Sequence, residues 1–199
     1  MLTFDEPTHT YRWDGKIVPS VTQVLSAWST IAKLPQEILA PAAERGQIVH
    51  TLTQHDDEGD LDEDWAVEHG YMGYVVAWRL FRSKYLFMPI SREQRIYHHE
   101  LGYAGTYDAV GEAEMQVGRK IRKVRALFDI KSGSSDPVHT MQTIAYARAT
   151  IDNSLVRGCV YLRANGDFAF EQHPNDQEDW ADWLACLRHY HWRQRNGID

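Results

Sequence analysis

The chain is poor in cysteine: its 199 residues include only two, Cys159 and Cys186. Two cysteines are too few for a disulfide framework, and they exclude a four-cysteine iron–sulfur cluster. Long apolar runs are also missing. The best one, residues 71–78, is far shorter than the roughly 20 apolar residues of a membrane-spanning helix, so we expect no membrane partner. The N-terminus has no basic segment followed by an apolar one, so we expect a cytoplasmic protein without a secretory signal.

Apolar residues are nonetheless numerous enough for a folded core. They make up 43% of the sequence, and aromatic residues alone make up 12%, fractions far from those of disordered chains. The length suits one ordinary domain, and we find no internal repeat or linker. We therefore expect a single domain with three parts: residues 1–88 as a hairpin with helices, 89–173 as a sheet with one helix, and 174–199 as a C-terminal helix.

Hydrophobic periodicity separates helices from strands along the chain. Residues 11–18 alternate around a glycine turn, which predicts a hairpin. The expected helices are residues 20–25, 35–55 with an interruption at Pro41, 62–85, 138–151 and 177–195. The expected strands are residues 91–99, 103–112, 124–131, 155–164 and 167–173. These elements predict an α/β fold with a central mixed sheet flanked by helices.

Charge is concentrated in two segments of opposite sign. Seven of the nine residues from 56 to 64 are acidic, which equals the formal net charge of −7, and we interpret this segment as a solvated loop. A cluster of cations follows later in the chain, at Arg119, Lys120, Arg122, Lys123 and Arg125. This basic segment is either solvated surface or a contact for phosphates, because clustered Lys and Arg side chains neutralise phosphates and release counterions.

Two short motifs carry the residues best suited to catalysis. Asp108 closes the motif Gly-Thr-Tyr-Asp (105–108), and Asp129 opens the motif Asp-Ile-Lys-Ser-Gly (129–133) 21 positions later. Two carboxylates at neighbouring strand ends can chelate a hard divalent cation. Asp129 and Lys131 point to the same face of a strand, and an ammonium beside metal-binding carboxylates suits a negative substrate. Such a set is typical of phosphodiester hydrolysis; the alternative is a strand-end salt bridge beside an ordinary turn aspartate.

Further polar residues surround these motifs in a definite order. In chain order they are Ser20 and Thr22, Arg45 with Gly46, His50, Glu93, and the i, i+4 pair Gln142 and Tyr146. Together with the motifs at 105–108 and 129–133, this ordered set resembles the PD-(D/E)xK nuclease superfamily. Within it, the chain is similar to the RecB-like nucleases, near the phage-encoded and Cas4-like exonucleases. The resemblance covers about residues 18–150.

The resemblance implies a restriction-endonuclease-like core with a catalytic metal site. Asp108 and Asp129 would bind Mg²⁺ or Mn²⁺, with the Ile130 carbonyl as a backbone ligand. His50 matches the helical histidine that serves as an additional metal ligand in this group. Lys131 would position or activate the attacking water.

The resemblance also implies residues that contact the substrate. Glu93 would line the site, while Gln142 and Tyr146 would orient the catalytic lysine and contact the DNA near the scissile phosphate. Ser20 and Thr22, at a helix start where free N–H groups favour anions, would hold a DNA phosphate.

Three features of the chain qualify or extend the resemblance to the family. Arg45 is either a phosphate contact or a structural ion-pair partner. The iron–sulfur branches of the group carry four cysteines, so we expect this chain to be free of a cluster. The basic segment 119–125 stands between the two metal-ligand strands, so we expect it at the rim of the cleft, holding the DNA backbone.

The function implied is a metal-dependent DNA exonuclease that acts on single strands or on ends in phage or prophage recombination or replication. Its setting would be the cytoplasm of a bacterial or phage-infected cell, with a phage recombinase or a single-strand-binding protein as a candidate partner. Three alternatives remain open: a structure- or site-specific endonuclease, a catalytically silent DNA-binding accessory protein, and a hydrolase of small phosphate esters.

Overall fold

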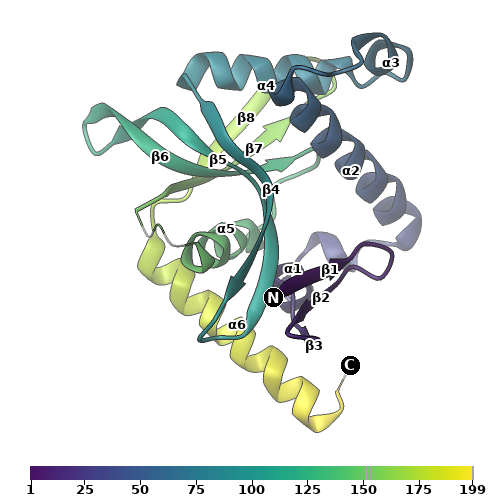
Figure 1. The fold of residues 1–199 in the computed structure, drawn as a ribbon, viewed down its shortest axis with the longest axis vertical. Coiled ribbons are helices and arrows are strands. Elements are labelled where there is room, and N and C mark those ends of the chain that lie inside the picture. Colours follow the sequence, from purple (N-terminus) through teal and green to yellow (C-terminus); the bar gives the residue numbers. More distant parts are fainter. Residues whose placement is uncertain (151, 153, 199) are drawn as a thin grey trace.

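Two β-sheets organise the chain in the computed structural model, which describes residues 1–150, 152 and 154–198. The small sheet is antiparallel, with β1 (Leu2–Asp5), β2 (Thr10–Trp13) and β3 (Lys16–Val18) in that order. The large sheet has the order β4 (Met88–His98), β5 (Tyr103–Val117), β6 (Lys120–Lys131), β7 (Val156–Leu162), β8 (Phe168–Gln172). It is mixed, because β6 and β7 are parallel while the other neighbours are antiparallel. The expected α/β fold with a mixed sheet among helices is confirmed (Figure 1).

The helices differ from the prediction mainly where glycine intervenes. They are α1 (Val21–Leu25), the 3-10 helix η1 (Ile31–Lys33), α2 (Gln36–Glu58), α3 (Glu63–Glu68), α4 (Met72–Tyr85), α5 (Val138–Ala149) and α6 (Asp176–Asn196). The helix predicted over 62–85 is divided into α3 and α4, because Gly70 adopts a left-handed φ of 75° that interrupts it. The predicted end of α5, at Ile151, lies outside the described residues. Within the described part of the chain, no helix is both long and apolar enough to cross a membrane.

Helix α2 continues through Pro41, where an interruption was expected. Proline in this second turn removes one backbone hydrogen bond. Further along, the helix buries Val49, Leu52 and Thr53 against the rest of the protein. Tertiary packing of this kind supplies most of the stability of a helix in a protein, so it outweighs the local cost of the proline.

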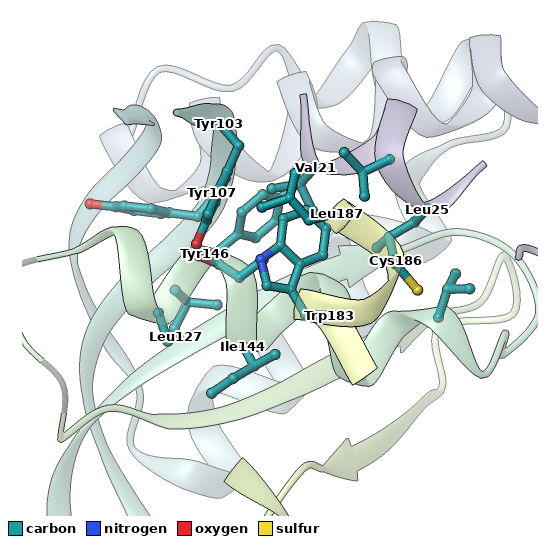
Figure 2. Packing of buried hydrophobic residues seen from close by; sticks show 14 of the residues in the cluster. Val21, Leu25, Tyr103, Tyr107, Leu127, Ile144, Tyr146, Trp183, Cys186 and Leu187 are labelled. Atoms are coloured by element: carbon teal, nitrogen blue, oxygen red, sulfur yellow. Dashed lines mark hydrogen bonds between the residues drawn. The ribbon is translucent and has the colours of Figure 1, made fainter. Parts of the chain in front are cut away.

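Helices cover both faces of the large sheet. α5, with α1 and α6, lies on one face, whereas α4 lies on the other and α2 contacts both α4 and β4. The side chains of β6 alternate between these layers: Leu127 packs under α5 and α6, and Phe128 packs under α4. Figure 2 shows Trp183 of α6 at the centre of the first layer, beside Leu187 and Val21. Trp183 is fully buried, so α6 contributes to the core.

Strands β5 and β6 form a longer hairpin than the sequence indicates. They reach Val117 and Lys120 and turn at Gly118, whose φ is 63°. Ala113 and Met115 are buried in the core beyond the predicted end of β5, and this packing extends the strand. The basic segment 119–125 is therefore mostly strand, and the tip of the hairpin projects beyond the sheet (Figure 1).

The start of the acidic segment is buried, so the expected solvated loop is wrong for Asp56 and Asp57. Both lie in the last turns of α2, and their side chains are only 5% and 4% exposed. Asp56 pairs with Arg79 of α4, at 2.6 Å. Asp57 pairs with Arg92 of β4, also at 2.6 Å. These ion pairs connect α2 to α4 and to the sheet.

We expect Asp57→Ala to lower the free energy of unfolding by about 3–5 kcal/mol, because removing one partner leaves a buried charge unpaired. The Arg92 side chain is only 7% exposed and its Nη1 lies 2.6 Å from Asp57. Urea denaturation measures the change. The matched control is Asp64→Ala, which removes an exposed carboxylate of the same segment and should change stability by at most about 0.5 kcal/mol. Equal losses in both variants would contradict the importance of the pair.

Candidate active site

One cavity of about 210 Å³ collects most of the residues singled out from the sequence. The predicted residues that line it are Ser20, Thr22, His50, Glu93, Asp108, Asp129, Lys131, Gln142 and Tyr146. They come from α1, α2, β4, β5, β6 and α5. Residues more than a hundred positions apart in the chain therefore meet at one place. We call this cavity the active-site cavity.

Strands β5 and β6 bring Asp108, Asp129 and Lys131 together. Ala109 pairs with Phe128 across the β5–β6 ladder, so Asp108 and Asp129 lie on adjacent strands at the same level. Both carboxylates are nearly inaccessible, at 5% and 1% exposure. Lys131 follows Asp129 by two residues and therefore points to the same face of β6.

His50 joins two carboxylates from different strands. Its Nδ1 lies 3.3 Å from Glu93 Oε1 and 3.4 Å from Asp108 Oδ1. Glu93 has a left-handed φ of 46° within β4, a conformation that non-glycine residues adopt rarely. One ligand atom from each of the three side chains lies within 4.8 Å of the other two. Such a set of imidazole and carboxylate atoms could hold a metal ion.

The backbone of Ile130 completes this cluster. The Ile130 N–H donates to Asp108 Oδ2, and the Ile130 carbonyl lies 2.9 Å from His50 Nε2. The predicted backbone ligand is thus in contact with the predicted histidine ligand. Asp129 is not one of the three side chains of this cluster. Its Oδ2 pairs with Lys131 Nζ at 2.6 Å.

The carboxylates control the protonation of His50. Burial by itself would lower the pKa of this imidazole, but the charges of Asp108 and Glu93 outweigh burial and raise its pKa to about 10. At neutral pH the imidazolium therefore neutralises part of the acidic cluster. A metal ion binds neutral imidazole, so its entry here would release a proton.

Lys131 lies in a chain of polar contacts that runs from β6 to α5. Its Nζ lies 2.6 Å from Asp129 Oδ2 and donates to Gln142 Oε1 at 3.1 Å. Gln142 Nε2 in turn donates to Tyr146 OH at 3.0 Å. Burial lowers the pKa of Lys131, but Asp129 and Asp108 outweigh that effect and raise its pKa overall. The lysine is therefore a fixed cation.

Ser20 begins a helix, as its sequence context predicts, whereas Arg45 lies outside the cavity. Ser20 is the N-cap of α1: its Oγ accepts from the Gln23 N–H, and Gln23 Oε1 accepts from the Ser20 N–H. Ser20 Oγ also lies 3.1 Å from Thr22 Oγ1. Arg45 does not line the active-site cavity, and its buried Nε has no hydrogen-bond partner among the described residues.

The basic segment does not reach the cavity. Lys120 is nine residues from Asp129 along β6, which corresponds to about 30 Å of strand. Lys123 pairs with Glu112 at 2.6 Å, and Arg125 pairs with Asp152 at 3.2 Å. Among the described residues, Arg119, Lys120 and Arg122 form no ion pair.

Some residues of the site were not chosen from the sequence. His9, Tyr11 and Thr106 line the cavity, and Tyr11 OH lies 2.7 Å from Thr106 Oγ1. Thr106 stands inside the Gly-Thr-Tyr-Asp motif, which was the available signal. Trp13, two residues after Tyr11 in β2, stacks on Tyr97 of β4.

Cys159 also belongs to the surroundings of the site. It is fully buried in β7. Its Sγ lies 3.7 Å from Asp129 Oδ2, because Asp129 and Cys159 are paired in the parallel ladder of β6 and β7. Cys186 is buried in α6, so the two cysteines lie in different layers.

Gly105 allows Tyr146 to approach the sheet. A Cβ atom at this position would lie 2.6 Å from Tyr146 Cε1. We expect Gly105→Ala to lower the free energy of unfolding by about 1–3 kcal/mol, as overpacking does. Urea denaturation checks this, with Gly133→Ala as the control because a Cβ there meets no atom within 4 Å. A Gly105→Ala protein as stable as wild type would show that Tyr146 moves without cost.

Comparison with family models and with curated proteins finds no match for the chain. The fold and the site therefore define a class on their own evidence. The protein is an α/β protein with a five-stranded mixed sheet. Strands β4 and β5 of that sheet and helix α2 carry a carboxylate–histidine cluster that could hold a metal ion.

Proposed function

We propose that this protein is a metal-dependent DNA exonuclease of the PD-(D/E)xK type with a restriction-endonuclease-like core. It acts on single strands or on DNA ends, in phage or prophage recombination or replication. The observation that carries the proposal is one cavity where the His50, Glu93 and Asp108 cluster adjoins the Asp129–Lys131 pair. Acidic ligands beside a fixed cation suit hydrolysis of a phosphodiester, which is negative before and during the reaction.

The donor set fits a hard divalent ion. Carboxylate oxygens are the ligands that Mg²⁺ and Mn²⁺ prefer, and an imidazole is acceptable to Mn²⁺. His50, Glu93 and Asp108 would hold the ion, with Asp129 and the Ile130 carbonyl as adjoining ligands. Bound there, the ion would supply Lewis-acid stabilisation of the phosphate and lower the pKa of a water molecule.

Lys131 supplies a positive charge that stays in place during the reaction. Asp129 and Asp108 raise the pKa of this ammonium, which suits a role in orienting a water molecule or a phosphate oxygen. Asp129 and Gln142 hold two sides of the ammonium, and Tyr146 holds Gln142. The chain of contacts therefore restrains the position of the ammonium.

The basic segment offers a second contact for DNA, away from the cavity. Arg119 and Arg122 carry no ion pair among the described residues. The logarithm of the binding constant falls linearly with the logarithm of the salt concentration, and each phosphate neutralised adds about 0.7–0.9 to the magnitude of that salt slope. We expect the double variant Arg119→Ala, Arg122→Ala to reduce that slope by roughly 1.4–1.8. Fluorescence anisotropy of labelled DNA over a salt series measures it. The control pair is Lys16→Ala, Arg188→Ala, two exposed cations elsewhere; an equal reduction there would contradict the assignment.

The test of the function is a gel assay of end-labelled single-stranded, duplex and circular DNA with Mg²⁺, Mn²⁺ or EDTA. We expect metal-dependent degradation of linear DNA and no cleavage of circles, and the labelled end will show the polarity. Cleavage of circles would instead indicate an endonuclease. Binding without cleavage under either metal would indicate a catalytically silent DNA-binding protein.

A further inference from the structure

A second cavity of about 220 Å³ adjoins the active-site cavity. Thr22, Lys131 and Gln142 line both of them, so a group bound in the second cavity lies directly beside the catalytic lysine. The remaining lining residues are Leu25, Ser26, Ser29, Ile31, Ala32, Asp136, Val138 and His139. None of these was assigned a role by the resemblance to the nucleases.

The wall of the second cavity is held in place by a buried carboxylate. Asp136 is 2% exposed, and its Oδ2 accepts from Ser29 Oγ at 2.7 Å and from the Ile31 N–H at 3.0 Å. Its Oδ1 accepts from the Val138 N–H at 3.3 Å. The segment between α1 and α2 is thus anchored to the start of α5. The cavity is formed before any ligand enters.

His139 lines this cavity, and one of its ring nitrogens has no protein partner among the described residues. The Asp136 N–H donates to His139 Nδ1 at 3.3 Å, and Tyr161 OH lies 3.0 Å from the same nitrogen. Because Nδ1 accepts, Nε2 carries the hydrogen of the neutral ring. Burial and the nearby charge of Lys131 lower the pKa of His139 to about 4, which keeps the ring neutral. The residue is 93% buried, its Nε2 has no hydrogen-bond partner among the described residues, and that atom keeps contact with solvent.

The serine hydroxyl hydrogens of the second cavity are already used. Ser29 donates to Asp136, Ser26 donates to the Gln23 carbonyl at 2.8 Å, and the oxygens of Asp136 are already occupied. Of the His139, Ser26 and Ser29 side chains, only His139 then offers a hydrogen to a group that enters the cavity. The other walls are apolar, from Leu25, Ile31, Ala32 and Val138. A suitable occupant has apolar faces, a carbonyl at its edge, and a phosphate attached to it.

We propose that the second cavity binds the unpaired nucleobase of the nucleotide next to the scissile phosphate, with a base carbonyl accepting from His139 Nε2. The proposal rests on the proposed nuclease function. A base in duplex DNA is stacked and paired, and entry into a pocket requires it to be flipped out at a cost of a few kcal/mol. The cavity accordingly explains a preference for single strands and frayed ends.

The experiment combines a cavity-filling variant with base removal from the substrate. Ala32 is exposed and lines the second cavity, so Ala32→Trp fills it without disturbing the core. The matched control is Ala27→Trp, an exposed alanine of the same segment that does not line this cavity. The substrates are single-stranded oligonucleotides with one abasic site, moved position by position along the strand. Cleavage rates are measured with Mg²⁺ and with Mn²⁺.

We expect one abasic position, next to the cleaved bond, to lower the wild-type rate by about tenfold, the order of one lost base contact. Ala32→Trp should lower the rate on the intact strand by a similar factor, and the two losses should not multiply when combined. Ala27→Trp should behave as wild type does. His139→Asn removes the Nε2 donor while keeping an acceptor near Nδ1. It should lower the cleavage rate on the intact strand by a similar factor and cause no further loss on the abasic strand. Thermal melting verifies that the variant is folded.

Two results overturn the proposal while the nuclease function stands. One is an abasic series with no sensitive position; the other is an Ala32→Trp loss of equal size on intact and abasic strands. If wild-type protein cleaves no DNA with either metal, the nuclease function fails and the base site fails with it. The two failures are distinguishable, because only the second abolishes cleavage by the wild-type protein.

Discussion

Asp129→Asn is expected to reduce the rate of DNA cleavage by roughly a thousandfold or more, because it removes several kcal/mol of transition-state stabilisation. The substitution keeps the volume of the side chain and removes its charge. Asp129 is 1% exposed and pairs with Lys131 at 2.6 Å, so the amide can neither attract a metal ion nor hold the ammonium equally well. The variant tests whether the active-site cavity is catalytic.

The measurement is the initial rate on end-labelled single-stranded DNA, with Mg²⁺ and with Mn²⁺. Asp182→Asn is the matched control, because Asp182 is an exposed carboxylate on α6, and it should keep the wild-type rate. Thermal melting shows whether the Asp129 variant is folded. A folded Asp129→Asn protein with wild-type activity would remove the active-site cavity from consideration as the place of the chemistry.

Lys131→Met should lower the rate of DNA cleavage by about a hundredfold to a thousandfold and leave metal binding intact. The ammonium contacts Asp129 and Gln142 and is not one of the ligand groups of the histidine–carboxylate cluster. Removing a cation close to acidic ligands leaves more negative charge there, so the affinity for Mn²⁺ should be unchanged or higher. The loss would therefore fall on the reaction and spare the binding of the ion.

Calorimetric titration with Mn²⁺ separates the two effects, and the cleavage assay follows turnover. Because Met leaves the buried Asp129 carboxylate unpaired, Lys131→Gln serves as a second variant that keeps a hydrogen-bond donor. Lys16→Met is the control at an exposed lysine. If both Lys131 variants fold and lose their affinity for Mn²⁺, the lysine is a structural counter-charge of the ligands.

Much of the local arrangement follows directly from residue spacing. The two-residue separation of Asp129 and Lys131 places both on one face of β6, and Gln142 and Tyr146 share a face of α5 at i, i+4 spacing. The order of helices and strands also follows from periodicity. These features depend on neighbours within a few residues, which is the range over which a sequence pattern acts.

Other features depend on partners far along the chain, so spacing could not predict them. The β5–β6 hairpin extends because Ala113 and Met115 pack in the core, and this carries the basic segment away from the cavity. Asp57 is buried because Arg92, 35 residues later, neutralises it. A charge pattern alone does not reveal which of its members has a buried partner.

Motif and periodicity are local properties, so the order of residues alone shows which side chains are available for the site. Only the tertiary structure brought His50 to Glu93, which is 43 residues away, through the contact of α2 with β4 and the left-handed backbone of Glu93. It alone placed His139 beside Lys131 in a second cavity. The physical reason is that helix packing and strand pairing determine distances between residues that no local pattern connects.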